Sequence, residues 1–161
     1  MDISIRAMTQ EDKPSIMQIL NNTVEFKPSE VIVAEEVIDS YLSDSYQSGF
    51  HILVAELNST IAGYICFGPT PLTEGTWDIY WMAVAFDKQR QGIGSALLES
   101  AEKSIGEAEG RLSIIETSST PAYDKTRHFH TRQGYKIIAH IPDFYAPGDD
   151  KLILQKRLRR N

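Results

Sequence analysis

The sequence predicts an α+β (mixed α/β) fold around one sheet, with the element order β-α-α-β-β-β-α-β-α-β-β. Three observations support this prediction. Short apolar runs rich in β-branched or aromatic residues recur along the chain, amphipathic helical segments lie between several of them, and one strand runs into a helix through a pair of glycines. With 161 residues and 42% hydrophobic content, the chain 1–161 is expected to form a single domain with a substantial core.

The elements follow from local patterns, taken in chain order. Thr9 is expected to cap the first helix, with Asp12 placed to complete a capping box. A polar tripeptide at 58–60 separates two apolar runs, which therefore predict a hairpin. Gly110 and Gly134 are expected to end the last two helices. The predicted strands are residues 4–8, 51–57, 61–67, 76–85, 112–117, 135–141 and 151–156, the predicted helices are 10–22, 28–42, 92–108 and 123–133, and 142–150 are expected to be a loop.

Charge and cysteine content limit the class of protein. The net charge is −6 and the pI is about 5.2, whereas nucleic-acid-binding domains more often carry a basic face, so no nucleic-acid partner is expected. The sequence shows no apolar run near the roughly 18 residues of a membrane span and no signal segment, so we expect a cytoplasmic protein without a membrane partner. The single cysteine, Cys66, agrees with this location because it cannot form an intramolecular disulfide.

Residues 89–95, which read QRQGIGS, place two glycines at the start of a predicted helix. A helix N-terminus presents unpaired N–H groups and a partial positive charge, and glycines let a phosphate approach without a Cβ in the way. The stretch therefore predicts a phosphate cradle, and the alternative is a glycine-bearing cap that binds nothing. A dinucleotide fingerprint is not matched, because the third glycine position holds Leu97, and the Gly-Lys-Ser/Thr of a Walker loop is absent.

The pattern Gln89-x-x-Gly92-x-Gly94, which follows the strand 76–85, resembles the acetyl-CoA signature of the GNAT N-acetyltransferase superfamily. Residues 129–135, FHTRQGY, resemble the second signature of that family. The element order matches as well, so the resemblance covers nearly the whole chain. It implies a GNAT-like acyltransferase fold, with a central mixed, mostly antiparallel sheet, a splayed pair of strands and helices on both faces. It also implies acetyl-CoA as co-substrate and no metal.

Carried over position by position, the resemblance implies a set of acetyl-CoA contacts. Backbone groups at Met82 and Val84 would bond the pantetheine arm, the N–H groups of residues 90–95 would bind the pyrophosphate, and Tyr123 stands where many relatives carry an asparagine that contacts the cofactor. The side chains of Gln89 and Arg90 have a simpler alternative as solvated residues. The expected cofactor-binding residues are Met82, Val84, Gln89, Arg90, Gln91, Gly92, Ile93, Gly94, Ser95 and Tyr123.

The implied reaction is acetyl transfer to a primary amine, which must first lose a proton because alkylamines have a pKa near 10.4. In several members of the family a carboxylate fourteen positions before the first glycine removes it, and Asp78 occupies that position. Glu116 on the next strand is the rival base. His130 stands where the family often has a tyrosine that protonates the departing thiolate, and a histidine there can donate a proton or simply pack. Tyr123 and Tyr145 are the alternative acids.

The strand 76–85 is also an expected wall of the acceptor site. Regular alternation would place Asp78 and Tyr80 on one face of the sheet, with Tyr80 towards the substrate. The same alternation would place Trp77 and Trp81 on the other face.

The acceptor, a small-molecule or peptide amine, is not identified by the sequence. Members of the family often form dimers, so a homodimer is a further hypothesis. The alternative function is a catalytically silent acyl-CoA-binding domain that senses or scaffolds, and the departure at His130 slightly favours it. Five aspartates are expected to form an acidic mouth for a cationic amine: Asp39, Asp44, Asp143, Asp149 and Asp150.

Overall fold

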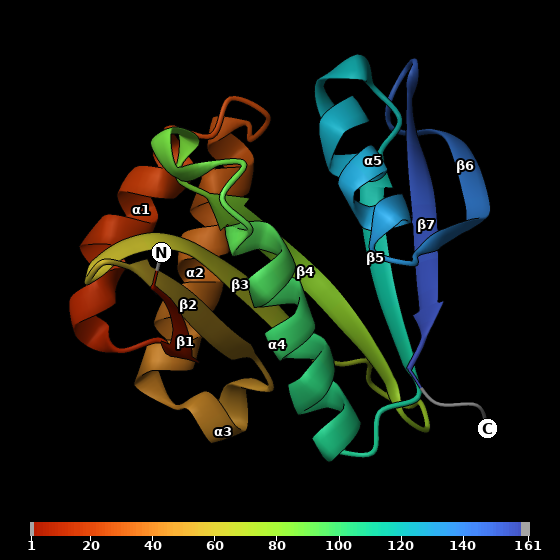
Figure 1. Ribbon diagram of the computed structural model, residues 1–161. Helices are drawn as coiled ribbons and strands as arrows, with labels where there is room; N and C mark the ends of the chain where they lie inside the picture. The colour runs from red at the N-terminus through yellow and green to blue at the C-terminus, as the bar shows by residue number, and fades with distance from the viewer. Residues whose placement is uncertain (1, 159–161) are drawn as a thin grey trace.

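The computed structural model describes residues 2–158 (Figure 1). Its strands are β1 (Ile3–Ala7), β2 (His51–Leu57), β3 (Thr60–Pro69), β4 (Thr76–Val84), β5 (Leu112–Ser118), β6 (Lys136–Ala146) and β7 (Asp149–Arg157). Its helices are α1 (Lys13–Asn21), α2 (Pro28–Ser43), α3 (Ser45–Ser48), α4 (Ile93–Glu107) and α5 (Asp124–Arg132), with short 3-10 turns η1 (Gln10–Asp12), η2 (Phe86–Lys88) and η3 (Pro121–Tyr123). None of the helices in this part of the chain combines the length and the hydropathy that crossing a membrane requires.

The strands within residues 2–158 form one seven-stranded sheet in the order β1-β2-β3-β4-β5-β7-β6. Neighbouring strands are antiparallel, with the exception of β4 and β5, which run parallel. A parallel pair needs a crossover connection, and α4 supplies it between β4 and β5. The mixed, mostly antiparallel sheet expected from the resemblance is therefore confirmed.

Helices cover both faces of the sheet (Figure 1). Helices α1 and α2 pack on one face, here called the α1–α2 face, through a buried cluster that includes Ile16, Leu20 and Ile38. Helix α4 packs on the other face, here called the α4 face, through a second buried cluster. Helix α5 lies on the same side, where its Phe129 packs against this second cluster. Fully burying one such Leu or Ile side chain contributes about 1.5–3 kcal/mol, so the two clusters anchor the helices to the sheet. The buried residues of α4 are Ile93, Leu97, Leu98, Ala101 and Ile105.

The closing hairpin differs from the expectation that residues 142–150 are a loop. Most of that segment belongs to β6 and β7, which leave Pro147 and Gly148 as the turn between them. Gly148 has a φ of +82°, a conformation that glycine adopts at little cost. Pro142 is tolerated because β6 is the outermost strand of the sheet, where a missing N–H disrupts no ladder. The sequence reading therefore failed to recognise a proline-containing edge strand.

A β-bulge in β4 decides which side chains face which side of the sheet. Trp81 and Ile79 lie opposite adjacent residues of β3, so Tyr80 is the extra residue of the bulge. Trp77 packs in the cluster on the α4 face, whereas Trp81 packs against the cluster on the α1–α2 face. The expectation that the two tryptophans share a face is wrong, because one extra residue reverses the alternation. Asp78 and Tyr80 flank the buried Ile79 and share the α1–α2 face, as expected.

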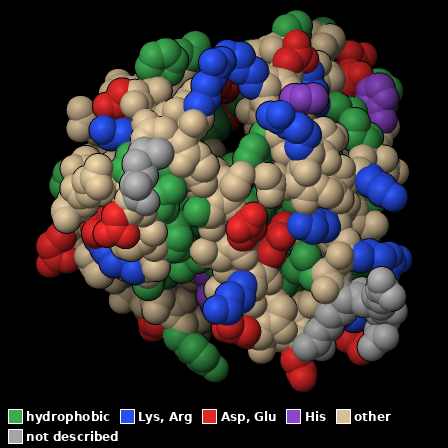
Figure 2. All heavy atoms as spheres, viewed as in Figure 1, with side chains coloured by type: hydrophobic (Ala, Val, Ile, Leu, Met, Phe, Trp, Pro, Cys, Tyr) green, Lys and Arg blue, Asp and Glu red, His purple; other side chains and the backbone are tan. Residues whose placement is uncertain are grey.

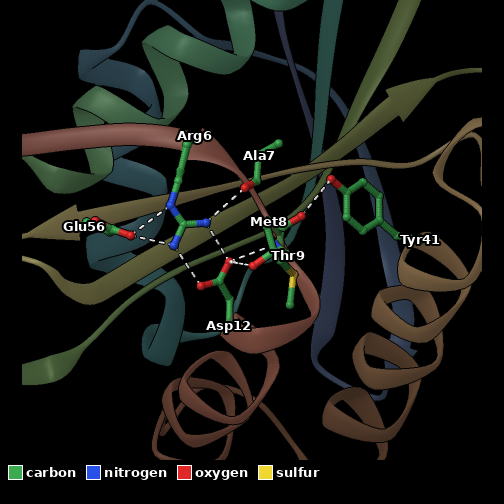
Figure 3. A network of polar contacts seen from close by, with 7 residues as sticks. All are labelled: Arg6, Ala7, Met8, Thr9, Asp12, Tyr41 and Glu56. Atoms are coloured by element: carbon green, nitrogen blue, oxygen red, sulfur yellow. Dashed lines mark hydrogen bonds and ion pairs between the residues drawn. The ribbon is translucent and has the colours of Figure 1, made fainter.

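The first strand is tied to the first helix by Arg6 (Figure 3). Its guanidinium donates to both carboxylate oxygens of Asp12, at 2.7 and 2.9 Å, and to Glu56 at 2.5 Å. Asp12 is buried and also accepts the N–H of Thr9 at 2.8 Å, so the expected capping box is confirmed. The bonds from Arg6 lower the pKa of Asp12. This network joins β1 to β2 and to the 3-10 turn that precedes α1.

Candidate active site

The central feature of the candidate site is the separation of β4 from β5 (Figure 1). In the described structure their parallel pairing is limited to four register pairs, which run from Thr76 with Leu112 to Ile79 with Ile115. Both strands continue beyond the last pair, without pairing to each other. The splayed pair of strands that the resemblance implied is therefore present, and it opens the centre of the sheet.

The edge of β4 along this opening presents the main-chain groups of Met82 and Val84. The N–H of Ala85 donates to the carbonyl of Ala62 in β3 at 2.7 Å. Because main-chain groups of alternate residues point to the same edge of a strand, those of Ala83 also face β3. The N–H and C=O groups of Met82 and Val84 then face the side from which β5 has departed. An extended amide chain can bond such an edge as an added strand does.

Helix α4 begins next to the end of β4. Gly92 is its N-cap, with a φ of +83° that favours glycine. The N–H of Ala96 donates to the carbonyl of Gly92 at 3.0 Å and starts the ladder of the helix. The preceding N–H groups, those of Ile93, Gly94 and Ser95, therefore have no partner within the helix. Together with the helix dipole they form an anion-binding end.

Open space lies beside this helix end. A Cβ added to Gly92 would meet no atom within 4 Å, and one added to Gly94 would touch the ring of Phe129 at 3.4 Å. Figure 2 shows a hollow between the loop that precedes α4 and helix α5, with Lys and Arg side chains at its rim. Gln133, after α5, donates to the hydroxyl of Ser95 at 3.0 Å and so links the two helices. The helix end and the β4 edge fit a ligand that joins an anionic group to an extended amide chain.

The residues expected around the anion differ in what they can contribute. Gln89 and Arg90 are exposed and Gln91 is half-buried, so their side chains lie at the surface just before the helix. Ile93 is buried in the core cluster of the α4 face, so its main chain alone is available to a ligand. The site on this face is therefore built mainly from backbone.

On the α1–α2 face, Asp78 lies at the base of the opening, one residue before the last β4–β5 pair. Its Oδ2 accepts a hydrogen bond from the hydroxyl of Thr70 at 2.6 Å. Tyr80 lies nearby with its ring edge-on to Phe50, at 5.4 Å between centroids. Burial first, and then the charge of Asp78, raise the pKa of Tyr80 to about 12. A carboxylate and a protonated phenol therefore share this part of the site.

Glu116, the rival base, follows the point at which β5 leaves β4. Its carboxylate is paired with the ammonium of Lys151 at 2.9 Å, and that ammonium also lies 4.3 Å from the ring centroid of Phe144. The two carboxylates thus have different partners, a cation for Glu116 and a hydroxyl for Asp78. The ion pair with Lys151 occupies the carboxylate of Glu116, whereas Asp78 keeps Oδ1 outside its bond to Thr70. This arrangement favours Asp78 over Glu116 for removing a proton.

His130 lies in the last turn of α5, and its side chain is 4% exposed. Its ring packs edge-on against Phe129 and Tyr135, with centroids 5.2 and 5.9 Å away. Burial lowers the pKa of His130 to about 4, so the imidazole is neutral at neutral pH. Its Nδ1 is buried and has no hydrogen-bond partner among the described residues. These properties are those of a packed residue and not of a charged proton donor.

The two alternative acids lie near the acidic residues around the opening. The hydroxyl of Tyr123 donates to the carbonyl of Glu25 at 3.1 Å and links η3 to the segment between α1 and α2. Burial, followed by the charges of Glu30 and Glu25, raises the pKa of Tyr123. Burial, followed by the charge of Glu116, raises the pKa of Tyr145, which is exposed on β6. Tyr123, expected to contact pantetheine, thus has its hydroxyl engaged with the protein.

The five aspartates expected to form an acidic mouth do not come together. Asp39 accepts a bond from Lys13 at 2.6 Å, and Asp44 caps α3. The other three lie in the β6–β7 hairpin, at the opposite end of the molecule from α3 (Figure 1). There Asp150 is paired with His140. The expectation is wrong because charge along a sequence carries no information about separation in space.

Sequence reasoning missed Thr70 and Lys151, the partners of the two carboxylates. Thr70 reaches Asp78 across the β3–β4 hairpin, and Lys151 reaches Glu116 across the β5–β7 pair. Both contacts depend on strand register, for which no local motif exists. Within residues 2–158, no group of three or more His, Cys, Asp and Glu side chains is arranged to hold a metal ion.

The splayed strand edge, the anion-binding helix end and a carboxylate at the opening together define an acyl-CoA-dependent acetyltransferase class of site. The family described as acetyltransferase (GNAT) domain matches residues 48–137, more than half of the chain, and the chain belongs to this GNAT acetyltransferase family. An uncharacterized N-acetyltransferase of Methanocaldococcus jannaschii is 28% identical over 107 residues, which cover 65% of this chain and 64% of that protein. The match thus spans just under two thirds of the length of that curated relative.

Solved structures agree with the assignment to this family. A protein of Desulfovibrio desulfuricans described as an acetyltransferase of the GNAT family has a TM-score of 0.94 and 36% identity, covering 98% of this chain and 100% of that chain. A Salmonella typhimurium protein solved with its cofactor acetyl-CoA has a TM-score of 0.79 and 19% identity, covering 99% of this chain and 95% of that chain. The second similarity is one of fold.

Proposed function

We propose that the protein is an acetyl-CoA-dependent N-acetyltransferase, in which a primary amine attacks the thioester directly in a ternary complex. The observation that carries this proposal is that the anion-binding end of α4 and the unpaired edge of β4 meet at one opening in the sheet. A diphosphate joined to a pantetheine arm has the charge and the amides that these two features complement. Membership of the GNAT family supports the same ligand.

Bound acetyl-CoA would supply an acetyl group as a thioester. The N–H groups of residues 93–95 hold the diphosphate, with the side chains of residues 89–91 beside it. The main chain of Met82 and Val84 holds the pantetheine amides along β4. The glycines at the helix start keep this space free of side-chain atoms. Binding on this side therefore depends on backbone geometry.

Asp78 is the proposed general base. An alkylamine has a pKa near 10.4, so at neutral pH it must give up a proton before it can attack. Asp78 lies at the base of the opening, on the face opposite α4. Its side chain is short, which suits relay of the proton through a water molecule. Glu116 remains paired with Lys151 and serves to shape the same wall.

The departing thiolate needs little assistance, because a thiol of this kind has a pKa of roughly 8.5. The low pKa of His130, about 4, leaves that residue neutral and packed, so we assign it to the stability of α5. Tyr145 is the side-chain donor that the site retains, since it is exposed and close enough to Glu116 for that charge to raise its pKa. Solvent completes the protonation where Tyr145 does not.

The acceptor approaches from the α1–α2 face, where Tyr80, Tyr123 and Tyr145 surround the opening. A primary amine on a small molecule, an amino acid or a protein fits this approach. The test is thiol release from acetyl-CoA in the presence of separate pools of amino acids, polyamines, aminoglycosides and peptides, with the acetylated product identified by mass spectrometry. Release with at least one pool, lost in Asp78→Asn, supports the proposal.

The second candidate function is a catalytically silent acyl-CoA-binding domain, and the neutral, buried His130 at the position of the family's tyrosine favours it. It predicts that acetyl-CoA binds to the protein and that no amine pool releases thiol. Absence of acetyl-CoA binding would contradict both functions.

A further inference from the structure

Thr70 makes a short side-chain contact at the base of the opening. It follows the last residue of β3, and its hydroxyl donates to Oδ2 of Asp78 at 2.6 Å. A hydroxyl that bonds a carboxylate at this distance makes a charge-assisted bond, which is stronger and more directional than a bond between neutral groups. The hydroxyl of Thr70 therefore constrains the plane of the Asp78 carboxylate.

The backbone of Thr70 is itself held from two sides. Its N–H donates to the carbonyl of Thr76 at 2.8 Å, and its carbonyl accepts a bond from the hydroxyl of Thr73 at 2.8 Å. Pro71 follows directly and restricts Thr70 to an extended conformation. The backbone of the hairpin thus fixes where the Thr70 hydroxyl can lie, in addition to the rotamer of the Thr70 side chain.

The partner of Asp78 differs in kind from the partner of Glu116. An ammonium, as on Lys151, is a compact charge that attracts a carboxylate with little directional preference, whereas a hydroxyl bonds one carboxylate oxygen in a defined direction. The hydroxyl of Thr70 therefore orients Asp78 and leaves Oδ1 outside its bond.

We propose that Thr70 is a positioning residue that holds Oδ2 of Asp78 and thereby presents Oδ1 to the amine or to a relaying water. This inference rests on the proposed N-acetyltransferase function. A base displaced by about 1 Å can cost on the order of 100-fold in rate, so loss of the hydroxyl is expected to lower kcat by about 10- to 100-fold. The Michaelis constant for acetyl-CoA is expected to stay within about twofold, because Thr70 does not touch the cofactor side.

The experiment is a double-mutant cycle on the purified protein, with wild type, Thr70→Val, Asp78→Asn and the double variant. The quantities measured are kcat and the Michaelis constants for acetyl-CoA and for an amine that releases thiol in the pool screen. Thr70→Val keeps the shape of the side chain and removes the hydroxyl. If Thr70 acts through Asp78, Thr70→Val lowers kcat in the wild type and has no further effect in the Asp78→Asn background. Thr70→Ser, which keeps the hydroxyl, restores most of the rate.

Thr60→Val is the matched control, because Thr60 is an exposed threonine at the opposite end of β3 from Thr70. It is expected to keep kcat within about threefold of wild type, because it removes the same kind of hydroxyl away from Asp78. An unchanged kcat in Thr70→Val, with Asp78→Asn inactive, would overturn this inference and leave the proposed function standing. An equal loss in both Asp78 backgrounds would overturn it as well. A wild type that acetylates no amine would overturn the proposed function and this inference together.

Discussion

The two faces of the β4–β5 opening are built from different parts of the chain. On the α4 face, the groups available to a ligand are main-chain N–H and C=O groups of α4 and β4. On the α1–α2 face, they are side chains, and the two carboxylates are held by side chains of neighbouring strands or turns. Thr70 bonds Asp78 across the β3–β4 hairpin, and Lys151 pairs with Glu116 across the β5–β7 pair. Backbone groups are placed by the fold itself, whereas side chains are placed by their neighbours. Ligand binding on the α4 face is therefore expected to be sensitive to added side-chain bulk. Catalysis on the α1–α2 face is expected to be sensitive to the loss of a side chain or of its hydrogen-bond partner.

The largest effect is expected on the side-chain face. Asp78→Asn removes the proposed base and keeps its shape, so kcat should fall by about 10²- to 10⁴-fold, the usual contribution of a general base. The dissociation constant for acetyl-CoA, measured by titration calorimetry, should stay the same because Asp78 lies on the other face. Glu116→Gln is the matched control and should lose less than about tenfold. A larger loss in Glu116→Gln than in Asp78→Asn would reverse the assignment of the base.

The second effect belongs to the backbone face. Gly94→Val adds a branched side chain between Phe129 and Val84, beside the helix end, and should weaken acetyl-CoA binding by about 100-fold, or ~2.7 kcal/mol. Gly106→Val, near the other end of α4, carries the same cost in helix propensity and meets no atom within 4 Å at its Cβ. Titration calorimetry should show that Gly106→Val binds acetyl-CoA with the same affinity as the wild type. Equal affinities in the two variants would argue against a ligand at this helix end.

The third effect concerns His130 and separates stability from catalysis. Its folded pKa of about 4 lies below the ordinary value near 6.5, so between these values the unfolded chain binds more protons and folding stability falls as the pH is lowered. The free energy of unfolding should drop by about 2 kcal/mol between pH 7 and pH 5 through this group. Denaturation with urea at both pH values should show a smaller drop in His130→Phe.

The same variant tests the role of His130 in turnover. His130→Phe should keep kcat within about fivefold at pH 7.5, because a neutral, packed ring contributes no charged acid. Loss of turnover with retained acetyl-CoA binding would restore His130 as a proton donor.

The smallest effect is expected at Tyr123, whose hydroxyl links η3 to the segment between α1 and α2. Tyr123→Phe removes the bond to the carbonyl of Glu25 and should lower the free energy of unfolding by about 1 kcal/mol. Acetyl-CoA affinity should change by less than about twofold, because the hydroxyl is engaged with the protein and not with the cofactor. Tyr145→Phe, whose ring is exposed on β6, should leave stability unchanged. A strong loss of affinity in Tyr123→Phe would return this residue to the cofactor side.

The difference between the faces also explains what could be predicted from the sequence. The helix end was predictable because Gly92 and Gly94 are spaced for it within a few residues, and the splayed strands followed from the resemblance that this spacing carries. The acidic mouth was not predictable, because Asp39 and Asp150 are brought to different places by tertiary packing. The bulge at Tyr80 was missed for the same reason, since an extra residue is visible only against the partner strand.

The proposed site requires that a diphosphate and its amide arm lie against backbone groups at the meeting point of α4 and β4. Backbone ¹⁵N–¹H NMR of the protein titrated with acetyl-CoA tests it most directly. The largest saturable shifts are expected on the amides of Gly94, Ser95, Met82 and Val84, with little change in β1. Saturable binding with its largest shifts away from these amides, or no saturable binding, would contradict it.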